Sequence, residues 1–509
     1  MLSFFALPIF GLTWQSTFAQ PAVADCASFA ASLQLEEHHT TIINATDFAM
    51  WEYEAANTIP FCQIFGNVSY GEAGDYLVFE IWLPDAQYYH GRFLAVGNGG
   101  FAGVLEPAEF LAALNLDMGF AIAGGDAGHR AALNGGAGAA PGEYIPFLHD
   151  PAQTQAWIHN GISLFTGAAK AITRERYGSI DHSYYDGCST GGGQGFALAQ
   201  RHPHLYDGII AGSPGNYYSH LMLSGLWFYV HTNTPATAFS VAQLNAMTAA
   251  VVAACSKQGL VSDGVIQNPL ACRFDVDSFG CQAANPALNA STCLSPAQLL
   301  AARAVYAGPR RTDTGAQIYP GFSLGSESSW TLLPAIAESF ASAILQNLVF
   351  DDLTYNISTF NFGSDVDTLN QRAGTKIDDV DPALESFHHK GGKLLVYQGW
   401  ADQINAAAWP IEHLYQSEAV FGCVEDWYEL FMIPGAGHCG LNTAYPQTPT
   451  VFNTLQALVP WVENGVRPTQ IEANTPMNGA NITVKLCPWP QTARYSGGSA
   501  DEWTSYVCR

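Results

Sequence analysis

The sequence predicts an α/β fold in which a mainly parallel sheet is covered by helices on both faces and a second, helical unit is inserted. Short apolar runs bounded by glycine, such as residues 119–123, have the character of buried parallel strands. Longer stretches with apolar residues at helical spacing, such as residues 151–175, alternate with them. Alternation of these two kinds of element is typical of a parallel sheet with helices on both faces.

The expected elements follow one another in order along the chain. In the first part we expect strands and helices at 75–83, 91–97, 119–123, 151–175, 183–186, 192–201 and 208–212, with Gly-rich loops at 97–103 and 133–142. The pattern returns near the C-terminus, with strands expected at 393–398 and 430–434 and helices at 406–418 and 449–464.

Between these two parts the sequence changes character. Helical stretches are separated by Pro, Gly and Asn loops, and four cysteines lie within residues 255–293. We therefore expect an α/β domain made of residues 20–215 and 391–509, interrupted by a disulfide-stapled domain of residues 216–390. The helices of this insertion are expected at 240–255, 295–306 and 332–349.

Charge excludes two classes of partner. The 509 residues contain 19 Lys and Arg against 44 Asp and Glu, which gives a net charge of −25. Nucleic-acid binding depends on phosphate contacts from basic residues, and anionic membrane surfaces repel an acidic chain, so we expect neither partner. A hydrophobic fraction of 48% with only 12% charged residues excludes disorder for the bulk of the chain.

The N-terminus has the pattern of an export signal. Residues 2–14 are apolar but too few to span a bilayer, and small-residue cleavage patterns follow at 17–19 and 22–24. No Lys or Arg precedes the run, and the alternative is an N-terminal strand of the fold. We expect a signal peptide over residues 1–19 and a secreted, extracellular protein. Five glycosylation sequons, which also arise by chance, agree with export: Asn44, Asn67, Asn289, Asn356 and Asn481.

The eleven cysteines are interpreted as a disulfide framework, because an oxidising compartment favours bridges and no C-x-x-C motif suggests zinc. Three local pairs are expected: Cys255–Cys272, Cys281–Cys293 and Cys487–Cys508. One cysteine must be left over, and the sequence alone does not say which.

The strongest chemical signal is the pentapeptide Gly187-Cys188-Ser189-Thr190-Gly191, a G-x-S-x-G motif between an expected strand and an expected helix. In a strained strand-to-helix turn of this kind the serine hydroxyl projects above the sheet, next to a helix N-terminus that favours a developing negative charge. The alternative is a structural Gly-rich turn.

A serine nucleophile needs a base and an acid that orients the base. Asp402 follows the expected strand 393–398, and His438 follows the expected strand 430–434. Both positions lie just past the carboxyl ends of strands, where open α/β sheets place their sites, and the chain order is Ser, Asp, His. Three rival acids follow no comparable strand: Asp365, Asp367 and Asp426. If Ser189 and His438 meet, their neighbours Cys188 and Cys439 come close enough for a disulfide.

These segments resemble the tannase/feruloyl esterase family with its CS–D–HC motif. The resemblance covers nearly all of the mature chain and rests on GCSTGGGQG (187–195), LYDGIIAGSPG (205–215), GWAD (399–402), PGAGHC (434–439), GNGGFAG (97–103) and FAIAGGDAGH (120–129). It implies an α/β-hydrolase fold with a large lid domain inserted at 216–390. It also implies ester hydrolysis with Ser189 as nucleophile, His438 as base and Asp402 as its orienter. The same resemblance implies Cys188–Cys439 and Cys26–Cys62 bridges, with Cys423 left free.

In this fold the oxyanion hole takes one N–H from the residue after the nucleophile, here Thr190. We expect the second donor in the early Gly-rich loop, at Gly100, with Gly99 as the alternative; the loop could instead be an ordinary β-turn loop. His129 is expected either at the mouth of the site or in a structural role. The paired histidines His38–His39 and His388–His389 have no spaced ligand partners, so we expect no metal there.

The family's lid calcium loop is altered in this chain. Its pattern C-D-x-x-D-G-x-x-D-G-x-I corresponds to residues 255–266, where Ser256 and Gly259 replace two aspartates and only Asp263 remains. One carboxylate with Lys257 nearby should bind Ca²⁺ too weakly, so we expect no metal and no cofactor, unless carboxylates from elsewhere complete the site.

We expect a secreted serine carboxylic-ester hydrolase that releases hydroxycinnamic acids (ferulate, p-coumarate, caffeate) from plant cell-wall esters. The alternatives are a tannase that hydrolyses galloyl esters and a catalytically silent phenolic- or carbohydrate-binding protein. The expected partner is a small or polysaccharide-linked aromatic ester. Core packing is the default for the lid aromatics, some of which could stack on that ester: Trp227, Phe228, Tyr229, Trp330 and Phe340.

Overall fold

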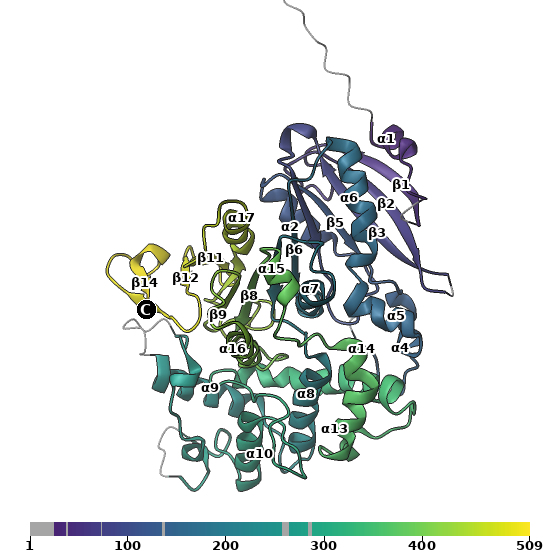
Figure 1. The fold of residues 1–509 in the computed structure, drawn as a ribbon. Helices are drawn as coiled ribbons and strands as arrows, with labels where there is room; N and C mark the ends of the chain where they lie inside the picture. Colours follow the sequence, from purple (N-terminus) through teal and green to yellow (C-terminus); the bar gives the residue numbers. More distant parts are fainter. Residues whose placement is uncertain (1–24, 37–38, 73, 135–137, 257–263, 284–287) are drawn as a thin grey trace, which may run out of the picture.

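The computed structural model describes residues 25–36, 39–72, 74–134, 138–256, 264–283 and 288–509 (Figure 1). The predicted signal peptide, residues 1–19, lies outside the described residues. So do His38 and residues 257–263, the centre of the loop that we compared with a calcium site.

The described residues form one large mixed sheet. Its strand order is β1-β2-β3-β5-β4-β6-β7-β8-β9. The six strands from β5 to β9 run parallel, and β1, β2 and β3 are antiparallel to their neighbours. The bounds are β1 (Thr40–Phe48), β2 (Phe61–Tyr70), β3 (Asp75–Pro84), β4 (Arg92–Val96), β5 (Phe120–Gly125), β6 (His182–Cys188), β7 (Gly208–Gly212), β8 (Lys393–Gly399) and β9 (Tyr428–Ile433).

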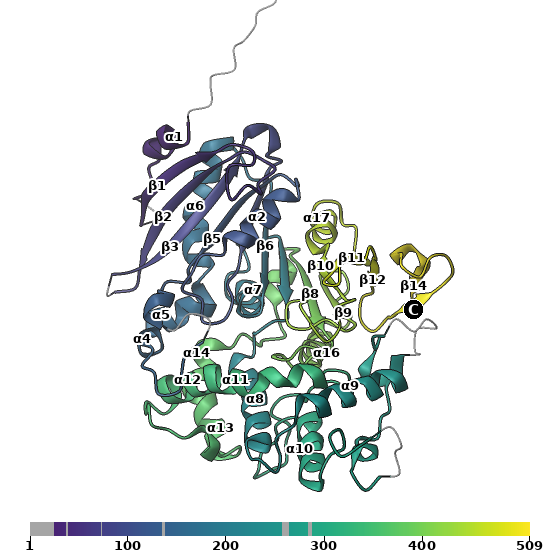
Figure 2. The same cartoon turned by 180° about the vertical axis from the view of Figure 1, so that it is seen from behind.

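Side-chain alternation along the central strands builds a separate core on each face of the sheet. Tyr185 packs in a core with α6 and α7, whereas its neighbour Tyr184 packs in a core with α2 and α17. Helices therefore cover both faces, as predicted (Figures 1 and 2). The helices of this part are α1 (Cys26–Ser32), α2 (Pro107–Asn115), α3 (Ala131–Asn134), α4 (Pro146–His149), α5 (Pro151–Gln155), α6 (Ser163–Tyr177), α7 (Thr190–Arg201), α16 (Trp409–Phe421) and α17 (Thr454–Asn464). A further helix, α15 (Glu385–His389), lies at the end of the segment 216–390 but packs on this part, because its Phe387 belongs to the same core as Tyr185.

Residues 216–390 are mainly helical and lie below the carboxyl ends of the parallel strands in Figure 1. Capping boxes at Ser240 and Ser295 start two of the helices, with Gln243 and Gln298 as the reciprocal partners. The helices are α8 (Tyr218–Thr232), α9 (Val241–Cys255), α10 (Pro296–Ala307), α11 (Leu333–Ile336), α12 (Ser342–Ile344), α13 (Ser364–Leu369) and α14 (Thr375–Ile377).

One core joins this insertion to the sheet domain. It contains Phe101 and Trp157 of the sheet domain together with Leu226 and Ile344 of the insertion. The helical run Glu327–Val349 passes a length and hydropathy test for a membrane span, but 61% of its most apolar window is buried in the protein. We therefore assign the run to the core of the insertion.

Five disulfides tie the described elements together. Cys26–Cys62 joins α1 to β2, and Cys188–Cys439 joins β6 to the loop after β9. The other three are the predicted local pairs Cys255–Cys272, Cys281–Cys293 and Cys487–Cys508. Cys423 is free and exposed.

Some elements differ from the sequence prediction. The helix expected at 449–464 begins at Thr454, because residues Pro449–Phe452 form β10, which pairs with β11 (Ile471–Pro476). The helix expected at 151–175 is divided by a π-turn at Ala156–Asn160. Two further pairs had no prediction: β11 with β12 (Val484–Leu486), and β13 (Ala493–Tyr495) with β14 (Tyr506–Cys508).

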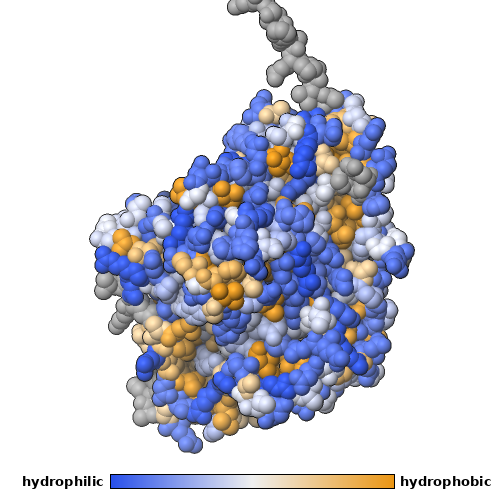
Figure 3. Space-filling view, in the orientation of Figure 1, coloured by the Kyte–Doolittle hydropathy of each residue, from blue (hydrophilic) through white to orange (hydrophobic). Residues whose placement is uncertain are grey.

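The surface agrees with an acidic chain that has a large core. Hydrophilic side chains cover most of the face in Figure 3, and apolar patches interrupt them. Four of the five predicted sequons carry an exposed asparagine, and Asn67 is half-buried in β2.

Candidate active site

Ser189 occupies a sharp turn between a strand and a helix. β6 ends at Cys188 and α7 begins at Thr190, so Ser189 is the connecting residue, and its φ of 64° is in the left-handed region. The neighbouring glycine is needed for this turn, because a Cβ on Gly187 would lie 2.7 Å from the Gly191 carbonyl oxygen. The serine is therefore held above the sheet at the N-terminus of α7.

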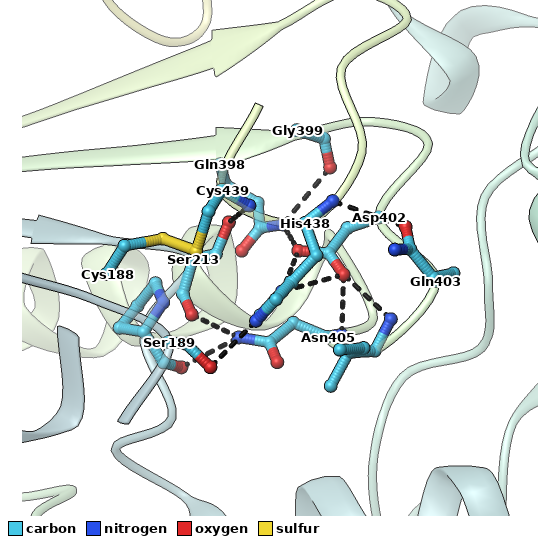
Figure 4. Close-up of a disulfide and its surroundings, with 12 residues drawn as sticks. Cys188, Ser189, Ser213, Gln398, Gly399, Asp402, Gln403, Asn405, His438 and Cys439 are labelled. Atoms are coloured by element: carbon cyan, nitrogen blue, oxygen red, sulfur yellow. Dashed lines mark hydrogen bonds and ion pairs between the residues drawn. A yellow bond between two sulfur atoms is a disulfide. The ribbon is translucent and has the colours of Figure 1, made fainter. Parts of the chain in front are cut away.

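The structure brings Ser189, His438 and Asp402 into one hydrogen-bonded chain (Figure 4). His438 Nε2 is 2.7 Å from Ser189 Oγ. His438 Nδ1 is 2.9 Å from Asp402 Oδ2 and 3.1 Å from Oδ1. Asp402 follows β8 and His438 follows β9, so neighbouring parallel strands deliver both side chains to the end of β6.

Asp402 is buried and fixed by three further donors. Its Oδ1 accepts the backbone N–H groups of Ile404 at 2.7 Å and Asn405 at 2.9 Å, and its Oδ2 accepts Gln398 Nε2 at 2.8 Å. Burial acts to raise the pKa of Asp402, but the His438 ring and two backbone N–H groups outweigh it, so the pKa is lowered. Asp402 therefore stays ionised beside His438.

The rival acids lie elsewhere. Asp365 and Asp367 are on α13 of the insertion, where Asp367 pairs with Arg311 at the surface. Asp426 lies in the loop before β9, and its carbonyl oxygen accepts the Lys393 ammonium group. The described structure brings none of the three to His438.

The Cys188–Cys439 disulfide links the two residues that adjoin Ser189 and His438. The bridge closes 251 residues with a Cα–Cα distance of 6.0 Å. The backbone N–H of Cys439 also donates to Ser213 Oγ at 3.3 Å. The loop that carries His438 is thereby attached covalently to the turn that carries Ser189.

The early Gly-rich loop lies against the serine turn. The Gly100 carbonyl accepts Thr190 Oγ1 at 2.7 Å and Trp157 Nε1 at 3.1 Å, and Gly100 has a φ of 53° that favours glycine. Within the described residues the backbone N–H groups of Thr190 and Gly100 have no acceptor. The N–H of the alternative donor, Gly99, interacts with the Glu106 carboxylate. Among the described residues, two N–H groups without an acceptor therefore belong to residues around Ser189: Thr190 follows it in the chain, and Gly100 lines the same cavity.

Sequence reasoning missed Gln194, which holds this loop to α7. Its Oε1 accepts the Asn98 N–H at 3.1 Å, and its Nε2 donates to Asn98 Oδ1 at 3.1 Å and to the Trp157 carbonyl at 2.8 Å. Gln194 is part of the GCSTGGGQG segment, so the motif includes this residue, but the sequence does not indicate that it binds Asn98 and Trp157. His129 supports the same loop, because it is buried, contacts the Phe101 carbonyl and stacks on Phe147 at 4.1 Å.

Ser189 opens into a cavity of about 650 Å³. The lining comes from the Gly-rich loop with α2, from the insertion, and from the segment 450–456. Of the lid aromatics singled out in the sequence, Phe340 lines this cavity. Phe228 and Trp330 are buried in a core within the insertion. Trp227 and Tyr229 are partly buried and pack against the core that joins the insertion to the sheet domain. The volume and apolar walls suit a small aromatic ligand.

A metal would need a cluster of ligands. In the part of the chain that the structure describes, no group of three or more His, Cys, Asp or Glu side chains is arranged to hold an ion. The loop at 257–263 lies outside that part.

Comparison with known proteins places the chain among esterases. Residues 62–509 match the family described as tannase and feruloyl esterase. A probable feruloyl esterase of Arthroderma benhamiae is 30% identical over 89% of this chain and 86% of its own, and an uncharacterized esterase of Xanthomonas campestris is 29% identical over 96% and 91%.

Solved structures of esterases superpose on this chain over most of its length. Feruloyl esterase B from Aspergillus oryzae superposes with a TM-score of 0.81 at 25% identity, covering 95% of this chain and 99% of that one. A tannin acyl hydrolase from Aspergillus niger has a TM-score of 0.70 at 22% identity, over 92% and 90%. The predicted α/β-hydrolase fold is confirmed.

Proposed function

This chain belongs to the tannase and feruloyl esterase family, and is a carboxylic ester hydrolase; on that premise we propose that it is a secreted serine esterase that releases hydroxycinnamic acids from plant cell-wall esters. The observation that carries the proposal is the continuous chain of hydrogen bonds from Ser189 through His438 to Asp402 at a mainly apolar cavity. The acids in question are ferulate, p-coumarate and caffeate.

Acylation begins when His438 Nε2 takes the proton of Ser189 Oγ and the oxygen attacks the ester carbonyl carbon. The N–H groups of Thr190 and Gly100 and the N-terminus of α7 stabilise the oxyanion. The bond to the alcohol oxygen then breaks, and His438 protonates that oxygen. Asp402, held ionised by its donors, stabilises the imidazolium that forms in between.

Deacylation repeats the same steps with water. His438 takes a proton from a water molecule, the hydroxide attacks the acyl carbonyl carbon, and Ser189 Oγ leaves and recovers its proton. An active-site serine phosphonate should therefore label the wild-type protein and leave Ser189→Ala unlabelled.

The substrate class is tested by steady-state rates. We expect a higher kcat/KM for methyl ferulate, methyl p-coumarate and methyl caffeate than for methyl gallate. A site that bonds three ring hydroxyls would reject ferulate strongly. A preference for methyl gallate would replace the proposal with the tannase alternative, and hydrolysis of neither class would refute both.

Secretion is part of the proposal. Five disulfides are typical of an oxidising compartment, and the N-terminal apolar run has the pattern of a signal peptide. We expect the enzyme in the culture medium, with its N-terminus near residue 20. Protein retained in cells with residues 1–19 still attached would contradict this.

A further inference from the structure

The active-site cavity extends along the face of the sheet that α2 and α17 cover. Its floor includes Leu94 and Val96 of β4, Asp186 of β6 and Tyr397 of β8. Its walls come from α2 on one side and from residues 450–456 on the other. We call this part of the cavity, which leads away from Ser189 between those walls, the α2 arm.

Tyr397 reaches across a strand to enter the α2 arm. Gly212 on β7 pairs with Tyr397 on one side and with Cys188 on the other. A Cβ on Gly212 would overlap the Tyr397 ring at Cζ and at the hydroxyl oxygen, so the phenol lies directly over this glycine. The missing side chain at Gly212 therefore lets the Tyr397 hydroxyl approach β6 just below the serine turn.

Asp186 presents a carboxylate on the same floor. It is two residues before Cys188 on β6, and it lies on the same face of the sheet as Tyr184, because side chains alternate along a strand. Asp186 lies three residues before Ser189, so its carboxylate lies on the strand that leads into the serine turn.

Neither polar group has a protein partner among the described residues. With the described residues the Asp186 carboxylate and the Tyr397 hydroxyl make no hydrogen bond or ion pair, although both side chains line the cavity. Burial, and then the charge of Glu109 on α2, raise the pKa of Asp186 to about 7. Burial likewise raises the pKa of Tyr397. Both side chains are half-buried and line the cavity, so a ligand hydroxyl that donates to one and accepts from the other fits this pair.

The walls around this pair are apolar. Leu116 of the α2 side faces the cavity, as do Phe452 and Leu455 of the opposite side. Phe452 also makes an edge contact with Tyr397, with ring centroids 5.3 Å apart. An aromatic ring could pack between these apolar walls while its hydroxyl forms hydrogen bonds with Asp186 and Tyr397 on the floor.

We propose that Asp186 and Tyr397 bind the phenolic hydroxyl of the acyl ring and select for it. This inference rests on the proposed function, since it assumes an aromatic acyl group on Ser189. It also favours hydroxycinnamoyl over galloyl esters. The vinyl spacer of a hydroxycinnamoyl group carries its ring hydroxyl further from the carbonyl carbon, and Asp186 lines the same cavity as Ser189 at a position three residues away along the chain.

The test compares two esters that differ by one hydroxyl, methyl p-coumarate and methyl cinnamate. Tyr397→Phe keeps the ring over Gly212 and removes only the hydroxyl, and Asp186→Asn removes the charge. For each variant we expect kcat/KM to fall about tenfold on p-coumarate, the size expected for a hydrogen bond to a charged or buried group, and by less than twofold on cinnamate. Tyr184→Phe is the matched control, because its hydroxyl bonds Glu463 outside the cavity.

The outcomes separate this inference from the proposed function. If the wild type hydrolyses neither ester nor methyl ferulate, the proposed function fails. If it hydrolyses them but Tyr397→Phe and Asp186→Asn lose equal activity on both esters, the hydroxyl site is refuted and the proposed function stands. Calorimetric titration of Ser189→Ala with p-coumarate and with cinnamate gives a second measurement. Tighter binding of p-coumarate, abolished by adding Tyr397→Phe, supports the site, and equal binding of the two acids refutes it.

Discussion

Ser189 is the residue on which hydrolysis should depend most strongly. Ser189→Ala removes one hydroxyl and leaves the β6–α7 turn in place, so folding should be unaffected. We expect kcat on methyl ferulate to fall by at least about a thousandfold, as in other enzymes that lose a serine nucleophile. The melting temperature should match that of the wild type.

The control for this experiment is Ser364→Ala, which removes an exposed hydroxyl of the insertion. Its rate should equal that of the wild type. Activity of Ser189→Ala within tenfold of the parent would show that another residue is the nucleophile.

Gln398 is a positioning residue that acts through Asp402. Gln398→Leu removes one of the donors on Asp402 Oδ2. A carboxylate with fewer donors is less stabilised in its charged form and is protonated at higher pH. We expect kcat/KM to fall about tenfold and the acid limb of the pH–rate profile to move to higher pH.

Gln403→Leu is the comparison for Gln398. Gln403 Oε1 accepts the backbone N–H of His438, and among the described residues the Gln403 side chain makes no hydrogen bond to the Asp402 carboxylate. Its loss should lower the rate without moving the acid limb. An unshifted acid limb in Gln398→Leu would mean that Gln398 has only a packing role.

The sequence predicted the three residues that the structure joins by hydrogen bonds, but not the residues that hold them in place. Ser189, Asp402 and His438 each follow an apolar strand, which is a local pattern that can be seen in the sequence. Gln398 and Gln194 act across contacts of the folded chain, and a glutamine carries no local mark that distinguishes an orienting amide from a surface one. Such partners become visible only when the strands are assembled.

At the scale of elements, the Cys188–Cys439 bridge joins the serine turn to the base loop. Replacing both cysteines by alanine should lower activity and the melting temperature together. The chain-entropy model gives about 5 kcal/mol as an upper bound for so long a loop. Hydrolysis rates, thermal melts and mass spectrometry of a non-reduced digest are the measurements.

The Cys487–Cys508 bridge provides a matched comparison, since it closes only 21 residues at the C-terminal end of the chain. Its removal should lower the melting temperature and leave the rate per folded molecule unchanged. Free thiols at Cys188 and Cys439 in the wild-type digest would contradict the bridge.

The strands at the centre of the sheet could be predicted from the sequence because they are buried, whereas the edge strand β1 and the short strand β10 could not. The central strands are buried on both faces, so their apolar runs stand out in the sequence. β1 forms the edge of the sheet, and five of its nine residues are partly or fully exposed polar residues, so Thr40–Phe48 has the composition of a loop. β10 was included in a helix because its pairing with β11 depends on residues more than twenty positions away.

At the scale of the whole molecule, buried carboxyl groups should make stability depend on pH. Burial raises the pKa values of Asp378, Asp379 and Glu429 to about 7 each. Between their ordinary values and pH 7 the folded state therefore binds more protons than the unfolded state, and the free energy of unfolding falls as pH rises through this window.

Buried histidines have the opposite effect on the free energy of unfolding, which they make rise with pH, but only at lower pH. Burial lowers the pKa values of His159 to about 3 and His413 to about 4, which costs stability as pH falls below about 6.5. Above that pH the carboxyl groups dominate. We expect the melting temperature to fall by a few degrees from pH 6.5 to 8.5. A constant or rising melting temperature over this interval would contradict the prediction.

Calcium should have no effect on the whole molecule. The loop at residues 255–266 keeps one of the three aspartates of the family pattern, so too few carboxylates remain for useful affinity. Thermal melts with and without EDTA should coincide. A drop of several degrees with the chelator, reversed by added Ca²⁺, would show that other carboxylates complete the site.

The bridge beside the active site also has a consequence for biosynthesis. Cys188 is translated 251 residues before Cys439, and five other cysteines are translated between them. On an exported chain, Cys188 therefore enters the oxidising compartment before Cys439, when other cysteines are available to form disulfides with it. Incorrect disulfides must then be exchanged for the native one by thiol–disulfide exchange. We expect the rate of ester hydrolysis per folded molecule to measure how correctly a host cell pairs these cysteines, because the Cys188–Cys439 bond attaches the His438 loop to the Ser189 turn.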